Sequence, residues 1–285
     1  MSSEKFFNTK KALITLIAAS LVVIVSLGIR QTFGLFFFDF NADLNISISH
    51  FGFVIGLQLL MWGVFSPIFG FITDRYGGAT AIFIGFLFYL AGLFLFYSGL
   101  NTGYLFTLTI GLLIGIGLGG TAISIPVSVV AKHFPSSNRT IATGIVTCAG
   151  SFGFFVSPLL VRYSLIEIGW EITILYFCFL LGIGLITALF ISTPKTPVGN
   201  NDNNNQTAKE ALIEAFNNKS FIFLTLGFFV CGWHIALVAT HIPTYMMDRG
   251  MPDWTAAMIL ALVGVFNMIG TMGSGYLATK FSKKK

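Results

Sequence analysis

Charged side chains are scarce in this sequence. Asp, Glu, Lys and Arg together make up 9% of its 285 residues, whereas hydrophobic residues make up 55%. Ordinary soluble domains carry about 25% charged residues, and the few charges here fall in short groups between long apolar runs. A water-exposed surface cannot be built from this composition, so we expect lipid to be the solvent for most of the chain.

Cysteines and catalytic motifs are also few. Cys148, Cys178 and Cys231 each lie inside a hydrophobic run, far apart in sequence and without metal-ligand spacing, so buried free thiols are expected. The sequence has no Ser/His/Asp cluster, no His-Glu-x-x-His run and no paired carboxylates, and its acidic residues lie between the apolar runs. No enzyme, metal site or cofactor is therefore predicted.

A nucleic-acid or nucleotide partner is not predicted either. The net charge is +5, but nucleic-acid binding needs basic residues on one face with reachable aromatic rings, and the 32 Phe lie inside the apolar runs. The run Gly115-Ile-Gly117-Leu-Gly119-Gly120 resembles a dinucleotide-binding loop, yet it lacks the preceding strand and an acidic residue about 20 positions on. Gly111, Gly115 and Gly119 instead form a stripe of small residues that predicts close helix packing.

The apolar runs have the length of transmembrane helices, because a bilayer core of about 30 Å needs about 20 helical residues. The first run follows Lys5, Lys10 and Lys11, but it is much longer than the roughly 7–15-residue core of a secretory signal and is predicted to be retained. An all-α membrane protein is expected. Its eight transmembrane helices are predicted at Ala12 to Phe38, Phe51 to Ile72, Ala79 to Ser98, Tyr104 to Ala131, Ile141 to Val161, Ile172 to Ser192, Ser220 to Tyr245 and Thr255 to Thr279.

The basic residues predict the orientation of these helices, because Lys and Arg collect in cytoplasmic loops. With the N-terminus inside, the outer loops hold only Arg162 and Arg249, and Arg30 lies within a span. Both termini are therefore predicted to be cytoplasmic. The composition favours a bacterial inner membrane and leaves a eukaryotic plasma membrane open. The inner segments hold Lys5, Lys10, Lys11, Arg75, Lys132, Arg139, Lys195, Lys209, Lys219, Lys280, Lys283, Lys284 and Lys285.

A polar segment and an internal repeat divide the chain. Residues 193–219 are polar and contain the Asn-rich tract 200–206, which is predicted to be a flexible cytoplasmic linker. It separates a six-helix bundle at 1–192 from two further helices at 220–285. A shift of 205 residues places the segment Gly70 to Gly77 on Gly275 to Ser282, so the second unit begins to repeat the first.

The loop between the second and third helices reads Gly70-x-x-x-Asp74-Arg75-x-Gly77 and resembles the conserved cytoplasmic loop of the major facilitator superfamily. The resemblance implies a twelve-helix transporter working by alternating access, of which this chain holds eight helices and is C-terminally truncated. It also implies that the glycines allow close helix contact, and that Asp74 and Arg75 make charge contacts that stabilise one conformation. A solvated loop pair is the simpler alternative.

Two positions after this motif depart from the family pattern. Gly78 and Ala79 stand where further basic residues are usual.

Three other segments resemble the monocarboxylate and oxalate/formate porters of that superfamily. They are Gly28 to Gly34, Arg139 to Gly144 and Ala239 to Pro243. Eukaryotic-type monocarboxylate porters carry an Asp and Arg pair in the eighth helix, whereas Thr255 to Thr279 holds no charge and only Asn267 as a strongly polar side chain. Proton coupling by that family's route is therefore not expected.

Arg30 is the main candidate for substrate binding. It lies deep in the first span, where an Arg costs at least about 2.5–3.5 kcal/mol to insert. Its guanidinium has five donors in a planar fork that matches a carboxylate, which favours anion binding together with the adjacent Gln31. The alternative is an Arg that reaches the outer head groups or bonds to backbone carbonyls.

His234 and His241 are seven residues apart and share one face of their predicted helix. The 205-residue shift places His234 beside Ile29, so we expect it to lie opposite Arg30 across a central cavity. The histidines and Asn267 are then expected to complete a substrate site, and a histidine to carry a coupling proton. The alternative is that each histidine is satisfied by a neighbouring helix.

These features predict a secondary active transporter whose cargo is a small organic anion such as a monocarboxylate. Two alternatives remain at this stage. One is a major facilitator carrier of a neutral or cationic solute. The other is a chain that does not transport by itself, either a truncated, transport-incompetent fragment or a subunit that donates helices to a partner.

Overall fold

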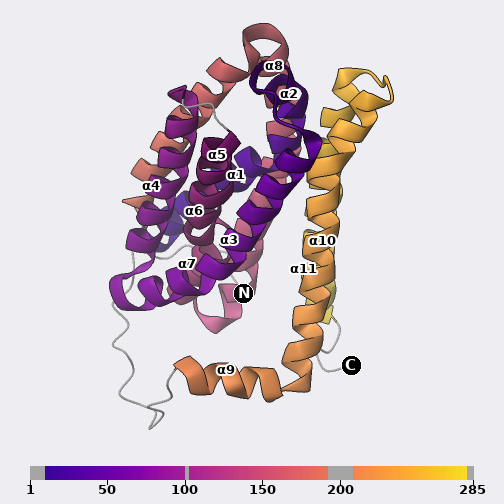
Figure 1. Cartoon of the computed structure of the whole chain (residues 1–285). Helices are drawn as coiled ribbons and strands as arrows, with labels where there is room; N and C mark the ends of the chain where they lie inside the picture. Colours follow the sequence, from indigo (N-terminus) through magenta and orange to yellow (C-terminus); the bar gives the residue numbers. More distant parts are fainter. Residues whose placement is uncertain (1–9, 100–102, 192–207, 281–285) are drawn as a thin grey trace.

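The computed structural model describes residues 10–99, 103–191 and 208–280, and all regular structure in these ranges is helical. Seven helical segments there are long and apolar enough to cross a membrane. One of them, Asn138–Ala188, has 51 residues and bends back on itself at Gly169. Its two arms bring the total to the eight helices that were predicted, and the all-helical membrane fold is confirmed (Figure 1).

The first span is not the single helix that was predicted from Ala12 to Phe38. Helix α1 (Lys10–Gln31) ends in a 3-10 turn, η2 (Phe33–Phe36), which leads into α2 (Phe37–Leu44). The hydroxyl and the amide of Thr32 both donate to the Ile29 carbonyl, at 2.8 and 3.2 Å. These short-range bonds replace the regular α-helical pattern and tighten the chain directly after Arg30.

Helix α3 (Ile48–Tyr76) and helix α4 (Gly78–Tyr97) are joined by Gly77 alone. Gly77 has φ 96° and ψ 154°, a backbone conformation that is essentially confined to glycine. Gly77 of the loop motif therefore makes the turn from the C-terminal end of α3 into the N-terminal end of α4.

The fourth span is interrupted twice. It consists of α5 (Gly103–Phe106), the π-helical segment η3 (Thr107–Leu113), α6 (Ile114–Thr121) and, after a bend, α7 (Ser124–His133). The predicted glycine stripe packs on α3, because a Cβ atom at Gly115 would lie 2.6 Å from the Gln58 carbonyl oxygen and one at Gly119 3.0 Å from Phe65 Cβ. Close packing by these glycines is confirmed.

Helix α8 (Ser136–Ala188) runs through residues that were predicted to form the loop between the fifth and sixth spans. Arg162 was expected in an outer loop, but the helix continues through it to Ile168. The polar residues in this stretch alternate with Val161 and Leu165, which are buried and hold it in the helix. The chain turns only at Gly169, whose φ of 80° suits glycine.

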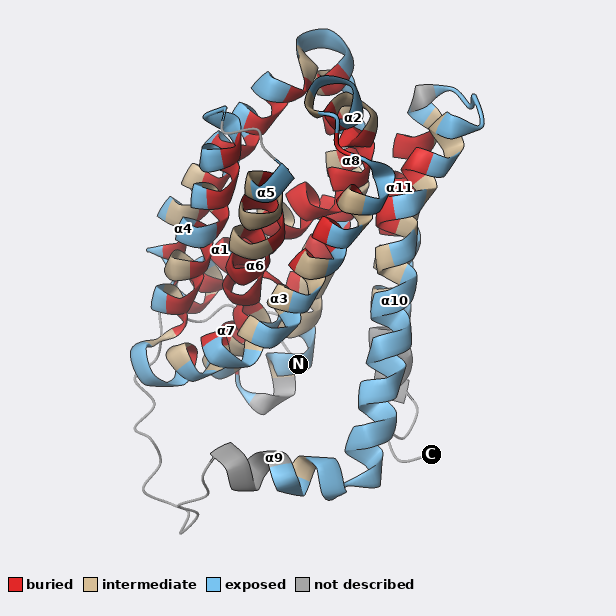
Figure 2. Cartoon of the chain, viewed as in Figure 1, coloured by how far each residue is buried: buried red, intermediate tan, exposed pale blue. Residues whose placement is uncertain are grey.

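The two arms of α8 enclose much of α1, and small residues permit this contact. A Cβ atom at Gly153 would lie 2.7 Å from the Ile24 carbonyl oxygen, and one at Gly28 would collide with the Ser157 side chain. The buried residues concentrate in this bundle of α1 to α8 (Figure 2).

The last three helices lie beside the bundle. Helix α9 (Ala208–Asn217) forms within the predicted linker, whereas its Asn-rich tract 200–206 lies outside the described residues. Helix α10 (Lys219–Asp248) and helix α11 (Asp253–Lys280) run side by side (Figure 1). The N-terminal half of α10 is exposed (Figure 2). Cys231 lies in this half and is exposed, so the expectation that it is buried is wrong.

Close backbone contacts at two glycines help to attach α10 and α11 to the bundle. Gly34 in η2 lies against the backbone of Ala239 and Thr240 in α10, and Gly264 in α11 lies against the backbone of Phe154 and Phe155 in α8. The division into 1–192, 193–219 and 220–285 remains a prediction.

Candidate functional site

Arg30 and Gln31 lie side by side at the C-terminal end of α1 and are almost fully buried. Arg30 is 4% exposed and Gln31 1% exposed. Nε and Nη2 of Arg30 and both amide atoms of Gln31 have no hydrogen-bond partner. A buried charge or amide without a partner costs free energy, so the predicted substrate-binding role of this pair has unused donors and an acceptor available to it and remains a prediction.

The phenol of Tyr89 in α4 is buried in the same part of the bundle as Arg30. This phenol is fully buried and donates a hydrogen bond to the Ser26 carbonyl oxygen, 3.3 Å away. It carries no charge and cannot neutralise the guanidinium. No hydrogen bond from Arg30 to a backbone carbonyl is found among the described residues, and the side chain is buried rather than extended along the surface.

Sequence reasoning missed Tyr89 and Gln58. The Gln58 side chain in α3 is fully buried, donates to the Ile110 carbonyl oxygen at 2.9 Å and leaves Oε1 without a partner. Gln58 is the strongest polar residue in an otherwise apolar span, and that scarcity was the signal available in the sequence. Nothing in the sequence distinguished Tyr89 from other aromatic residues.

His234 and His241 lie on α10, apart from Arg30. Both are exposed, and within the described ranges neither makes a hydrogen bond or an ion pair. His241 lines a small cavity of about 140 Å³ between α10 and α3, and its Cε1 lies 3.5 Å from the position of a Cβ atom at Gly52. The structure shows no contact of either histidine with Arg30, so their shared site remains a prediction.

Asn267 is half-buried on α11. Its side-chain oxygen accepts a long hydrogen bond of 3.5 Å from the Thr271 hydroxyl. No contact with Arg30 or with the histidines is shown, and its place in the substrate site remains a prediction.

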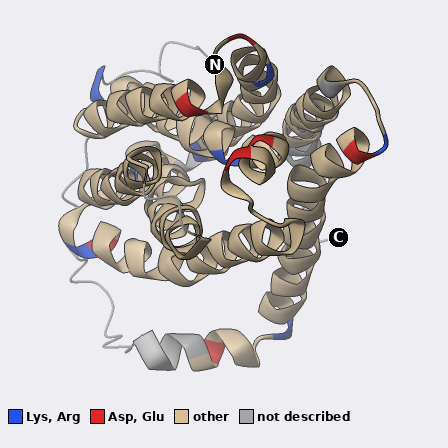
Figure 3. Ribbon diagram, turned by 45° about the horizontal axis from the view of Figure 1, so that its top comes forward, with Lys and Arg blue, Asp and Glu red and all other residues tan. Residues whose placement is uncertain are grey.

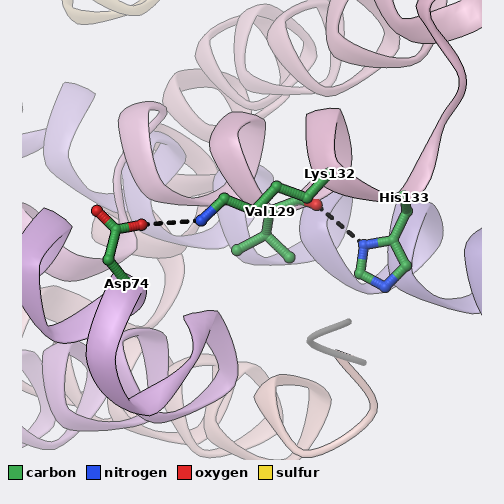
Figure 4. A network of polar contacts seen from close by, with 4 residues as sticks. All are labelled: Asp74, Val129, Lys132 and His133. Atoms are coloured by element: carbon green, nitrogen blue, oxygen red, sulfur yellow. Dashed lines mark hydrogen bonds and ion pairs between the residues drawn. The ribbon is translucent and has the colours of Figure 1, made fainter. Parts of the chain in front are cut away.

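The motif from Gly70 to Gly77 has an ion pair that the sequence did not indicate. Lys132 Nζ of α7 lies 2.8 Å from Asp74 Oδ1 (Figure 4), whereas the Arg75 guanidinium stacks on the neighbouring Tyr76 ring, 5.6 Å from its centroid. Gly78 packs against Val129 of α7, one turn before Lys132. This close approach brings α7 next to the loop.

The expectation that the motif glycines allow close helix contact is wrong for Gly70. The glycines were expected to allow close helix contact, but a Cβ atom at Gly70 would meet nothing within 4 Å among the described residues. Gly70 faces away from the helices that pack around this loop, and only Gly77 has a conformation that requires glycine.

The described residues contain no group of three His, Cys, Asp or Glu side chains that could hold a metal ion. Charged residues of either sign occupy few positions on the ribbon (Figure 3). The buried Arg30 is therefore the chemically distinctive group of the interior.

Comparisons with known proteins identify the fold. The chain is similar to the agnestins efflux protein AgnL12 of Paecilomyces divaricatus, with 24% identity over 95% of this chain and 61% of that protein. It is 23% identical to the hexuronate transporter of Bacillus subtilis (strain 168), over 85% of this chain and 58% of the relative. The chain thus spans about three-fifths of the length of these two relatives.

Among solved structures, the crystal structure of a D-xylose–proton symporter covers 95% of this chain and 69% of its own, with a TM-score of 0.64 and 17% sequence identity. This likeness shows the fold. The sequence profile described as Major Facilitator Superfamily matches residues 19–285. The arrangement of helices, the loop motif and this match together show that the chain is a multi-pass integral membrane protein that belongs to the major facilitator superfamily.

Proposed function

We propose that this protein carries a small organic anion, such as a monocarboxylate, across a membrane by alternating access. The observation that carries the proposal is the Arg30 guanidinium, which is 4% exposed and has two nitrogens without hydrogen-bond partners. A carboxylate that entered beside it would supply the missing acceptor and the opposite charge together. Gln31 would hold a further oxygen of the substrate.

The remaining candidate residues have subsidiary roles in this proposal. His234, His241 and Asn267 would complete the site when α10 and α11 move relative to the bundle, and a histidine would carry a coupling proton. The loop of Gly70, Asp74, Arg75 and Gly77 would stabilise one state of the cycle. The hexuronate transporter among the relatives supports an anionic cargo, since a hexuronate carries a carboxylate.

The membrane and orientation are also part of the proposal. The excess of basic residues in alternate segments supports cytoplasmic termini, and the composition supports a bacterial inner membrane. Members of this superfamily are transporters, which supports a transport role over catalysis.

A second candidate is a chain that acts only with further helices. The apolar window of α10 has no buried residue, and large side chains such as Phe228 and Trp233 are more than half exposed. In a complete transporter such a face would pack on neighbouring helices. Measurement of the native mass of the purified chain distinguishes a single chain from an assembly with a helix-donating partner.

The test is uptake by proteoliposomes that contain the full chain, with labelled lactate, glucuronate and xylose as probes. Arg30→Gln should reduce uptake of both anions by at least about 100-fold, because it removes a charge-assisted bond of roughly 3 kcal/mol. Arg30→Lys keeps the charge but not the fork and should lose less. Arg249→Gln, at the exposed turn after α10, is the matched control and should leave uptake unchanged.

Anion binding is measured in parallel, because binding does not need a complete transport cycle. Each anion should raise the melting temperature of the native chain and of Arg249→Gln, but not of Arg30→Gln. Uptake of anions that persists in Arg30→Gln contradicts the site. The neutral-solute alternative is supported if the native chain and Arg30→Gln take up xylose equally and neither anion is taken up or raises the melting temperature.

A further inference from the structure

A large apolar cavity lies between the two arms of α8, away from the Arg30 site. Its volume is about 640 Å³, and α1 forms its floor through Ile24, Val25 and Ile29. Arg30 itself does not line it. The remaining lining residues come from both arms of α8: Phe152, Val156, Ser157, Leu160, Val161, Tyr163, Ser164, Glu167 and Ile168 before Gly169, and Thr173, Tyr176, Phe177, Phe179 and Leu180 after it.

The cavity opens toward the side of the bundle that faces lipid. Leu160 is 63% exposed, Tyr176 54% and Phe179 67%, and all three belong to segments that are long and apolar enough to span the bilayer. A cavity of several hundred Å³ with apolar walls and a few polar groups is typical of a ligand site. A ligand that enters from this side must itself be soluble in the membrane.

The polar groups of the cavity gather at one end. Glu167, its one charged lining residue, stands two positions before the turn at Gly169. Tyr163 has an exposed phenol close by in sequence, while Ser164 and Thr173 satisfy each other across the arms at 2.7 Å. The opposite end, around Phe152 and Val156, is mainly apolar and has the Ser157 hydroxyl beside it.

The apolar lining at Val156 lies about one leaflet's depth along the helix from Glu167. Val156 and Glu167 are 11 positions apart, so about 16 Å of helix separates the apolar part from the carboxylate. The hydrocarbon core is about 30 Å thick, and half of it is about 15 Å. A chain inserted from the surface at Glu167 would end near the bilayer midplane.

We propose that this cavity binds one acyl chain of an outer-leaflet lipid whose head group carries a protonated amine. The acyl chain would lie against Val25, Val156 and Leu180, and the ammonium would pair with the Glu167 carboxylate. The Tyr163 hydroxyl would donate to the lipid phosphate. The carboxylate distinguishes this lipid from anionic ones, which it repels. The choice of the outer leaflet rests on the orientation given under the proposed function, whereas the site uses none of the proposed transport residues.

The experiment is native mass spectrometry of the full chain after incubation in mixed micelles of phosphatidylethanolamine and phosphatidylglycerol at equal concentration. The native chain should retain one phosphatidylethanolamine in preference to phosphatidylglycerol. Glu167→Gln should lower that preference by up to about fivefold, the effect of one ion pair at an exposed site. Val156→Trp fills the apolar end and should abolish retention of both lipids.

Matched variants separate binding from misfolding. Ile186→Trp places the same large ring on an exposed part of the second arm outside the cavity and should retain lipid like the native chain. Val25→Trp fills the cavity from α1 and should reproduce Val156→Trp, with folding checked by circular dichroism. Unchanged retention in both filled variants, or equal retention of the two lipids by the native chain, overturns the proposal.

Discussion

Lys132 and Asp74 join helices α7 and α3, with Nζ 2.8 Å from Oδ1. Lys132 is the ninth residue of α7, and Asp74 lies in the last turn of α3. Gly78 and Ala79, the first two residues of α4, stand where further basic residues are usual in the family. Because Gly78 packs against Val129, α7 comes close enough for Lys132 to supply that positive charge to Asp74.

This pair should contribute little to stability and depend on salt. The Asp74 side chain is 72% exposed, and exposed pairs are worth about 0.2–1 kcal/mol. A double-mutant cycle with Lys132→Gln and Asp74→Asn, measured by thermal unfolding in detergent at low ionic strength, should give a coupling energy in that range. The coupling should shrink at about 1 M salt, where the screening length is about 3 Å.

Arg75→Gln provides the control for this cycle. Its guanidinium stacks on Tyr76 and is not the partner of Asp74, so Arg75→Gln and Asp74→Asn should show additive effects. A coupling between Arg75 and Asp74 as large as that of Lys132 would mean that the pair was assigned to the wrong cation.

Gly77→Ala should destabilise the protein by about 1–3 kcal/mol. The φ of 96° and ψ of 154° at this residue lie in a region that a side chain with a Cβ atom avoids. The variant should therefore unfold at lower temperature or displace the ends of α3 and α4. Thermal unfolding of the purified chain is the measurement.

The other motif glycine is the matched control. Gly70 lies inside α3, and an added Cβ atom would meet nothing within 4 Å. Gly70→Ala should be neutral or stabilise by up to about 1 kcal/mol, since alanine favours a helix over glycine. If Gly70→Ala were as harmful as Gly77→Ala, backbone strain would not explain the role of Gly77.

The membrane helices were predictable because a long apolar run has few other stable conformations in lipid. The glycine stripe of α6 was predictable for a related reason, since residues at four-residue spacing share a helix face. The turn at Gly169 was not recognised. Arg162, Ser164 and Glu167 resemble a loop when read by polarity, and only the burial of Val161 and Leu165 shows that the helix continues.

The site was only partly accessible from sequence. Arg30 stood out because a charge in an apolar run is costly, and the structure confirms that it is buried. The involvement of Tyr89 depends on how α4 packs against α1, which no local pattern encodes. The Lys132–Asp74 pair likewise joins residues 58 positions apart through tertiary packing.

Trp170→Phe should lower the free energy of unfolding by about 1.5–3 kcal/mol, because it removes a bond between α8 and α2. The Trp170 indole donates a hydrogen bond of 2.6 Å to the Asp43 carboxylate, and bonds to charged groups are worth this much. Phenylalanine preserves the aromatic packing on Phe40, whose ring centroid lies 5.3 Å away, so the loss isolates the hydrogen bond. Unfolding in a denaturant series is the measurement.

Asp43→Asn tests the same bond from the other side. The amide oxygen still accepts from the indole, so this variant should lose less than Trp170→Phe, and the double variant should lose no more than Trp170→Phe alone. Full additivity of the two losses would show that the bond does not form in the membrane.

Gly264→Val should separate α11 from the bundle. A Cβ atom at Gly264 would lie 2.7 Å from the Phe154 carbonyl carbon, and backbone atoms of α8 cannot move aside as a flexible side chain would. Overpacking of this kind costs about 1–3 kcal/mol.

Gly270→Val is the control for this variant. Gly270 lies on the same helix and a Cβ atom there would meet nothing within 4 Å, so the substitution changes helix propensity in the same way but causes no collision. Spin-label distances between exposed sites on α8 and α11 should lengthen in Gly264→Val and stay unchanged in Gly270→Val. An unchanged distance in both variants, with equal melting temperatures, would show that the two helices are not in contact at this point.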